Sequence, residues 1–158
     1  MTEATVDPGI LAAARAVEDR LPFGDTRDLE DARRGLLGSR SPGTVHADDG
    51  RVVWNADAWA DVLAGPRPDT VHPSLWRQAQ LVALHGLYEV TDGIYQVRGM
   101  DLSNMTIVEG DRGVIVIDPL ISTETAADGL ALYREHRGDR PVTAVIYTPG
   151  DRGDLHPW

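Results

Sequence analysis

The chain has 158 residues, of which 42% are hydrophobic and 25% charged, with a formal net charge of −10 and a pI near 4.8. This composition is typical of a globular domain rather than a disordered chain. The negative charge argues against nucleic acid or an anionic membrane as a partner, because both are bound through basic surfaces.

The N-terminal part of the chain has a helical pattern. Apolar residues at positions 10, 11, 14, 17 and 21 recur at nearly 3.6-residue intervals and predict an amphipathic helix that Pro22 ends. Asp25 or Thr26 is expected to cap a second helix that runs through Leu37 and stops at Gly38.

A β-hairpin is predicted near residues 46–54, because Asp49-Gly50 suits a tight turn and β-branched residues follow it. Two more helices are predicted, one capped by Asn55 and one capped by Ser74. Residues 1–84 thus form a helical N-terminal segment. Its tryptophans are expected to pack in the interior rather than to form an apolar slot for a ligand: Trp54, Trp59 and Trp76.

After Gly86 the hydrophobic pattern changes to a period of two, which is typical of strands. The predicted order is four strands joined by Gly-containing turns, then a helix, then a last strand. Their expected ranges are 87–90, 94–97, 105–108 and 114–117 for the strands, 123–136 for the helix and 142–147 for the last strand.

The chain contains no cysteine, so disulfides and thiolate metal sites are excluded. Its first residues are acidic and lack the basic and apolar regions of a secretory signal. The longest purely apolar run, 114–117, is far too short to span a bilayer. We therefore expect a cytoplasmic protein without a membrane partner.

Three stretches of the chain resemble alkyl sulfatases of the metallo-β-lactamase superfamily: His72–Gln80, His85–Thr106 and Gly113–Leu120. The run from Arg98 to Thr106, Arg-Gly-Met-Asp-Leu-Ser-Asn-Met-Thr, is distinctive of that branch, and the Ile-Asp-Pro at 117–119 is common to the superfamily. The resemblance implies an α+β fold, the αββα metallo-β-lactamase-like sandwich, of which this chain holds the first half behind its helical N-terminal segment. Residues 85–148 would be the incomplete domain and 149–158 a tail.

The resemblance also suggests which residues support a site. Asp118 would lie beneath the metal motif and hold its geometry, or it would simply cap its own turn. The loop 99–104 would lie near the mouth of the site, where Asp101, Ser103 and Asn104 are candidates. The alternative for this loop is a turn closed by Asx and Ser caps. None of these four residues is expected to be catalytic.

The family continues the strand ending at Thr148 with a Thr-His-x-His-x-Asp-His motif, and this chain does not contain that motif. The resemblance implies two zinc ions that activate a bridging water. Zinc needs clustered imidazoles and a carboxylate, whereas none of the five histidines of this chain has another at i+2 or i+4. We therefore expect no catalytic residue and no metal ligand here. The chain is predicted to be a truncated fragment of a zinc-dependent alkyl sulfatase, inactive as given.

The substrate implied for the parent family is an alkyl sulfate ester such as dodecyl sulfate, and the family forms homodimers through regions that this chain lacks. Two other hypotheses remain open. The chain could be a non-catalytic interaction module that binds a partner through its exposed sheet. It could also be a small hydrolase that uses Asp151, Asp154 and His156.

The last ten residues suggest how the motif was lost. If residues 140–148 are encoded CGC CCG GTG ACC GCG GTG ATC TAC ACC and followed by CA, reading from the third base gives Pro-Gly-Asp-Arg-Gly-Asp-Leu-His-Pro. That is the sequence of residues 149–157. The CA is the start of a His or Gln codon, and the family motif has His at that place. The tail is therefore interpreted as an out-of-frame duplication.

This interpretation predicts that the DNA for residues 140–157 contains a near-perfect direct repeat of about 25 base pairs. Sequencing the gene checks it. Codons for 149–157 whose third bases do not match the shifted frame of residues 140–148 would exclude a duplication. Reading on in the original frame should recover the histidine motif.

Overall fold

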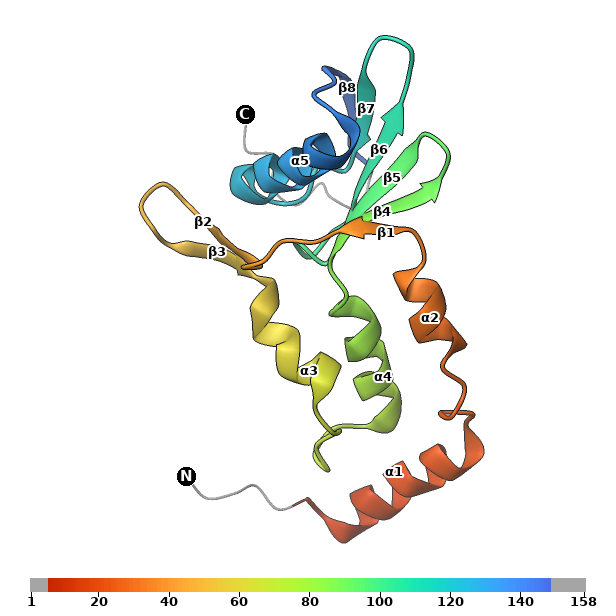
Figure 1. Ribbon diagram of the computed structural model, residues 1–158. Helices are drawn as coiled ribbons and strands as arrows, with labels where there is room; N and C mark the ends of the chain where they lie inside the picture. The colour runs from red at the N-terminus through yellow and green to blue at the C-terminus, as the bar shows by residue number, and fades with distance from the viewer. Residues whose placement is uncertain (1–5, 149–158) are drawn as a thin grey trace.

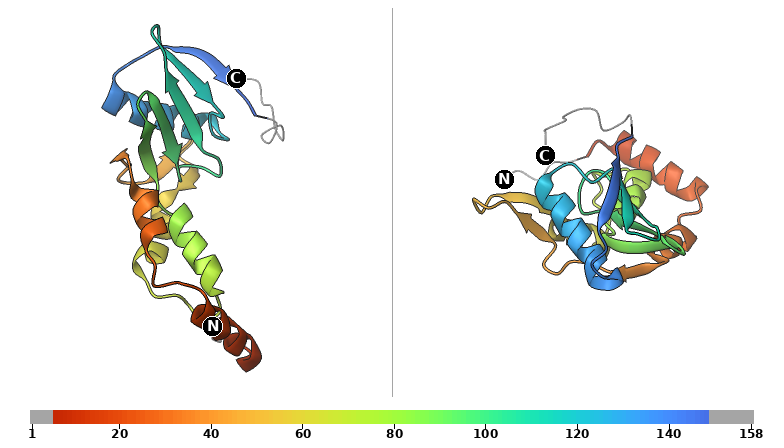
Figure 2. Two further views of the ribbon diagram at one scale, coloured as in Figure 1. Left: turned by 90° about the vertical axis from the view of Figure 1, so that its right-hand side faces the viewer. Right: turned by 90° about the horizontal axis from the view of Figure 1, so that it is seen from above.

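The computed structural model of the chain describes residues 6–148. A six-stranded sheet with helix α5 on one face lies at one end, and helices α1–α4 lie at the other end (Figure 1). The molecule is therefore elongated, as the side view in Figure 2 shows. Within residues 6–148, no helix is both long and apolar enough to cross a membrane.

The helical part is built from short elements linked by turns. They are α1 (Pro8–Arg20), α2 (Arg27–Arg33), the 3-10 helix η1 (Ala56–Trp59), α3 (Ala60–Ala64) and α4 (Pro73–Val82). The hairpin of β2 (Thr44–His46) and β3 (Val52–Asn55) precedes η1 and confirms the hairpin predicted near residues 46–54.

The sheet has the strand order β1-β4-β5-β6-β7-β8. Its strands are β1 (Leu36–Gly38), β4 (Gly86–Thr91), β5 (Ile94–Arg98), β6 (Met105–Glu109), β7 (Val114–Ile117) and β8 (Val142–Ile146). Neighbours are antiparallel except β7 and β8, which are parallel and joined by the crossover helix α5 (Thr123–Arg137). The strands and the helix predicted after Gly86 are all present.

The second predicted helix is wrong at its C-terminal end, because α2 stops at Arg33 and residues 36–38 form β1. Gly35 has φ +75°, and a Cβ there would lie 2.1 Å from the Glu89 carbonyl oxygen. Only glycine allows this close approach, in which Glu89 N donates to Gly35 O at 2.8 Å. Pairing with β4 outweighs the local helical pattern, so β1 joins the sheet from within the predicted helical segment.

The predicted cap of α4 is wrong, and the predicted cap at Asn55 is right in position but lacks a side-chain hydrogen bond. Helix α4 is capped by His72, whose Nδ1 accepts from Ser74 N, because Pro73 fills the first helical position and needs no amide partner. The Asn55 side chain makes no cap hydrogen bond and instead accepts from the Thr44 hydroxyl across the hairpin.

The tryptophans lie outside the buried core, contrary to the prediction. Trp59 is 47% exposed, and Trp54 and Trp76 are only partly buried. Trp54 has a different role, because its indole Nε1 donates to the Gly99 carbonyl at 3.2 Å. The hairpin is thereby joined to the loop between β5 and β6.

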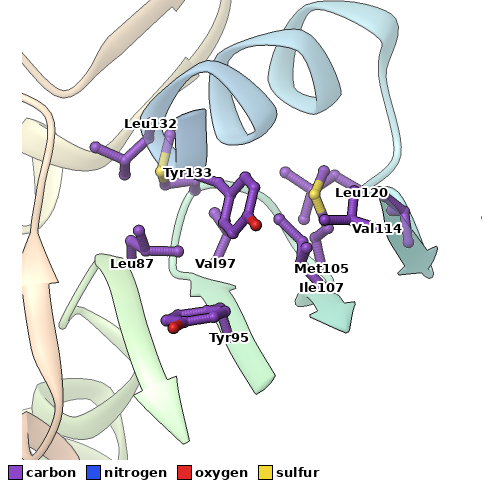
Figure 3. Close-up of a cluster of buried hydrophobic side chains, with 11 residues drawn as sticks. Leu87, Tyr95, Val97, Met105, Ile107, Val114, Leu120, Leu132 and Tyr133 are labelled. Atoms are coloured by element: carbon purple, nitrogen blue, oxygen red, sulfur yellow. The ribbon is translucent and has the colours of Figure 1, made fainter. Parts of the chain in front are cut away.

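The core lies between α5 and one face of the sheet (Figure 3). Tyr95 and Tyr133 meet there edge to face, with ring centroids 5.7 Å apart. Gly129, in the middle of α5, lets the helix approach, since a Cβ there would already touch Val97, Leu120 and Met105 at 3.3–3.5 Å. The buried cluster consists of Leu87, Tyr95, Val97, Met100, Met105, Ile107, Val114, Val116, Leu120, Leu132 and Tyr133.

A polar cluster holds the C-terminal end of α5. The Glu109 carboxylate at the end of β6 accepts from Tyr133 Oη at 2.7 Å and from Arg137 Nε at 3.1 Å, and it pairs with Arg140 at 3.2 Å. The hydrogen bond from Arg137 holds the pKa of Glu109 below its usual range. The β6–β7 hairpin and the helix are therefore fixed together.

Arg40 joins the linker after β1 to α5. Its Nε lies 2.9 Å from an Asp128 carboxylate oxygen, and its Nη1 donates to both Glu135 carboxylate oxygens at 2.7 and 2.8 Å. The guanidinium is largely buried, so water screens these pairs less than it screens surface pairs.

Strand β8 is the sheet edge opposite β1, and all five of its residues are exposed. Its large apolar side chains include Val145 and Ile146, which are 48% and 47% exposed. An exposed apolar edge strand is a template for pairing with another chain.

We therefore expect the 158-residue chain to self-associate through β8. Size-exclusion chromatography with light scattering should show assemblies that grow with concentration. Ile146→Lys should reduce them, because a charge on the edge opposes strand pairing. Val90→Lys is the matched control, since Val90 is equally exposed but lies in a strand with neighbours on both sides. A sharp monomer peak for the unmodified chain, without binding of an apolar dye, would contradict this expectation.

Candidate functional site

The carboxyl ends of β7 and β8 lie side by side because the two strands are parallel. Asp118, the first residue after β7, donates its backbone N–H to the Ile146 carbonyl at 2.9 Å. The segment that follows β7 therefore starts next to the point where β8 ends.

Asp118 holds Thr148 through both of its carboxylate oxygens. Oδ1 accepts from the Thr148 backbone N–H at 2.7 Å, and Oδ2 accepts from the Thr148 hydroxyl at 2.8 Å. The backbone and the side chain of Thr148 are both fixed by one carboxylate, so the direction in which the chain leaves β8 is fixed as well.

The turn that presents Asp118 has an unusual backbone. Asp118 and Leu120 both have positive φ, 51° and 68°, which side-chain-bearing residues rarely adopt. Leu120 N donates to the Asp118 carbonyl at 2.8 Å, and the Leu120 side chain is buried in the core (Figure 3). A strained backbone conformation persists only where the surrounding structure enforces it, and such residues cluster at functional sites.

Asp101 reaches the other end of this turn from the β5–β6 loop. Its Oδ1 accepts from Leu102 N at 2.6 Å and its Oδ2 from Ile121 N at 3.0 Å. Its Oδ2 also accepts from the hydroxyl of Thr125, a buried residue in the first turn of α5. Of the four predicted site residues, Asp101 and Asp118 are thus brought to one turn.

Ser103 and Asn104 lie in the same loop but do not join this network. The Ser103 hydroxyl is buried and has no hydrogen-bond partner within residues 6–148. Asn104 is exposed. Their predicted role at the mouth of a site remains a prediction.

Two residues of the network were missed by the sequence analysis, Thr125 and Thr148. Thr125 forms a capping box with Ser122, in which the Ser122 hydroxyl accepts from Thr125 N at 3.1 Å and Ser122 N donates to the Thr125 hydroxyl at 3.3 Å. The Ser-x-x-Thr spacing is close to that of a capping box and could have indicated this. No local sequence pattern could have predicted the contact between Thr148 and Asp118, because 30 positions separate the two residues.

The described residues do not form a zinc site. Among residues 6–148, no three His, Cys, Asp or Glu side chains are grouped so that they could hold a metal ion. Three of the histidines contact backbone carbonyls instead: His46 that of Gly50, His85 that of Arg40 and His136 that of Leu132. Asp151, Asp154 and His156 lie outside the described residues.

Two open hollows lie away from the strand ends. One, of about 560 Å³, lies between the end of α1, α2 and α4, and is lined by Phe23, Asp28 and Arg77 among others. The second, of about 870 Å³, lies between the β2–β3 hairpin and the start of α5. Neither includes Asp101 or Asp118.

Comparison with known proteins shows what the chain is similar to, first at the level of a superfamily and then within it. The family model described as the metallo-beta-lactamase superfamily matches residues 98–148, the stretch that contains the whole Asp101–Asp118–Thr148 arrangement. This sheet with its strand-end turn is therefore part of a metallo-beta-lactamase fold.

Within that superfamily, the relatives are alkylsulfatases. The chain is 50% identical over 141 residues to an alkyl/aryl-sulfatase of Saccharomyces cerevisiae and 48% identical over 138 residues to a linear primary-alkylsulfatase of a Pseudomonas species. These matches cover 89% and 87% of this chain, but the chain spans only 22% and 20% of the length of those relatives. Over the matched portion, the chain is therefore similar to alkylsulfatases.

A solved structure supports the same assignment. The stereoselective inverting sec-alkylsulfatase Pisa1 from a Pseudomonas species superposes with a TM-score of 0.83 at 43% sequence identity. The match covers 90% of this chain and 22% of that one. The predicted resemblance to alkylsulfatases and the predicted metallo-β-lactamase-like fold are therefore confirmed.

The two hydrogen bonds between Asp118 and Thr148 should contribute measurably to the free energy of unfolding. Asp118→Ala removes two hydrogen bonds and places alanine at positive φ, so we expect the free energy of unfolding to fall by about 2 kcal/mol. Asp118→Asn, which tolerates positive φ and keeps one acceptor, should lose less. Urea denaturation followed by tryptophan fluorescence measures both. Asp111→Ala, in the exposed turn between β6 and β7, is the control, and an equal loss there would contradict a special role for Asp118.

Proposed function

We propose that residues 6–148 are the N-terminal portion of a hydrolase of alkyl sulfate esters. The observation that carries this proposal is the 46–50% identity to three alkylsulfatases over 87–89% of this chain. Those relatives are named for linear primary, (R)-specific secondary and alkyl or aryl sulfates. The substrate class they have in common is a sulfate ester of an alkyl alcohol.

The reaction consumes one water and converts the sulfate ester to an alcohol and hydrogen sulfate. The net charge of −10 repels an anionic ester at long range. Recognition of the sulfate therefore needs local cations, and we assign these to the part of the enzyme beyond the matched portion. A cytoplasmic location and a homodimer formed through those other regions belong to the same proposal.

The contribution of this portion is to position the chain rather than to bind the reacting atoms. Asp118 fixes the amide and hydroxyl of Thr148, and in the family the next residues are the His-x-His-x-Asp-His ligands. A carboxylate that fixes the residue before the ligands would orient them, as supporting groups around metal sites do. Asp118 and Asp101 are proposed as such supports, with Ser103 and Asn104 on the rim of the site.

The superfamily implies a metal, and the resemblance names zinc, but the described residues do not fit it. No step through a metal is therefore assigned to them. A polypeptide of these 158 residues is proposed to be inactive by itself, because its sequence has no clustered imidazoles to hold the ion.

The alternative function is a non-catalytic interaction module. One observation favours it, the exposed edge strand β8, which could pair with a strand of a partner. A module that exists for this purpose should be monodisperse alone and should pair with one partner rather than with itself.

The experiment uses two proteins. The 158-residue chain should bind zinc no more tightly than micromolar and should release no sulfate from dodecyl sulfate. In the second protein, this chain up to Thr148 replaces the matched portion of the Pseudomonas linear primary-alkylsulfatase, so that the relative's own sequence follows Thr148. This hybrid should retain metal and hydrolyse dodecyl sulfate.

Within the hybrid, Asp118→Ala should lower kcat/KM or metal affinity by about tenfold or more. Asp111→Ala, at the opposite end of the sheet, should leave both unchanged. A folded hybrid without sulfatase activity would count against the proposed function. Sulfate release by the 158-residue chain above a buffer blank would show that the chemistry uses other residues.

A further inference from the structure

We propose that Asp101 is a positioning residue that sets the place of Thr148 through the turn 118–121. The inference depends on the proposed function in one respect only: in that function the position of Thr148 matters because the metal ligands follow it. Within residues 6–148, neither of the hydrogen bonds of Thr148 to a carboxylate goes to Asp101. The link runs from the Asp101 carboxylate to Ile121, along the turn to Asp118, and from the Asp118 carboxylate to Thr148.

The first part of the link is a carboxylate whose own orientation is fixed. Asp101 accepts from Leu102 N within its own loop and from the Thr125 hydroxyl in α5. Thr125 is 1% exposed and is fixed by its capping box with Ser122. Because these donors fix the carboxylate, Asp101 Oδ2 has a defined position. It accepts there a hydrogen bond from Ile121 N at 3.0 Å.

The second part is the turn itself, which has little freedom to absorb a displacement. Between Asp118 and Ile121 lie only Pro119, whose ring fixes φ, and Leu120, whose side chain is 6% exposed in the core. The hydrogen bond from Leu120 N to the Asp118 carbonyl further restricts the backbone conformations that the turn can adopt. A shift at Ile121 must therefore reach Asp118.

Because its backbone is strained, the turn is expected to change conformation when the hydrogen bond that holds it is removed. A positive φ strains the backbone of a residue that carries a side chain, and Asp118 and Leu120 both have one within three positions. The Ile121–Asp101 bond fixes the C-terminal end of this strained turn. Without that bond the turn can relax, and the Asp118 carboxylate then leaves the position in which it accepts from Thr148.

The simpler role for Asp101 is that of a cap for its own loop and for α5. Under that role its removal would weaken the whole fold or the start of α5 and would leave the Thr148 amide in place. The two roles predict different behaviour at Thr148, and the Thr148 amide proton is a direct probe. Its hydrogen bond to Asp118 is short, 2.7 Å, and should shift its NMR signal downfield.

The test compares Asp101→Ala with the unmodified chain by amide NMR and hydrogen exchange. We expect the Thr148 amide signal to move upfield and its exchange to become roughly tenfold faster, whereas the core amide of Ile107 keeps its protection. Asp101→Asn, which keeps one carbonyl oxygen, should give a smaller change in the same direction. Asp118→Ala gives the signal of a fully released Thr148, and Asp111→Ala is the control that should change nothing.

The proposal is overturned if Thr148 is unchanged in a folded Asp101 variant. It is also overturned if Thr148 and Ile107 accelerate by the same factor, since that is the signature of global destabilisation. If Asp101→Ala does not fold, Asp101→Asn decides by the same comparison. The measurement needs no turnover, so its failure and the failure of the sulfatase assay are separate results.

Discussion

The fold depends on the crossover from β7 through α5 to β8, and a carboxylate holds this crossover at each end. At the N-terminal end of α5, Asp101 binds Thr125 and the turn that follows β7. At the C-terminal end, Glu109 binds Tyr133, Arg137 and Arg140. Between these two anchors Gly129 lets the helix approach the sheet closely enough to bury the core. With both ends fixed, β8 has one available position beside β7.

The helical part of the molecule is attached to the same crossover. Strand β1 pairs with β4, Trp54 donates to the backbone of the β5–β6 loop, and Arg40 pairs with Asp128 and Glu135 on α5. Each attachment reaches either the sheet or the helix that covers it. These contacts tie the N-terminal segment to the sheet domain, although its helices extend away from it (Figure 1).

The strand-end turn and the end of β8 are held by two carboxylates, those of Asp101 and Asp118. The hydrogen bonds of Asp101 to Ile121 and of Asp118 to Thr148 are all made by groups within residues 6–148. A support that is complete before ligands are added can fix their direction at no further cost in ordering. This is the physical basis for the supporting role that we propose for these residues.

The sequence by itself determined the strands after Gly86, the hairpin near residues 46–54 and the crossover helix, because these rest on local hydrophobic periods and turn residues. It also determined the alkylsulfatase resemblance and singled out Asp101 and Asp118, since these lie in short distinctive runs. Only the tertiary structure decided that residues 36–38 leave the helical pattern to pair with β4, because that choice depends on Gly35 meeting Glu89 far along the chain. The partnership of Asp118 with Thr148 was likewise decided in three dimensions. It follows from the parallel alignment of two strands that are separated in sequence by a whole helix, and no local pattern carries that information.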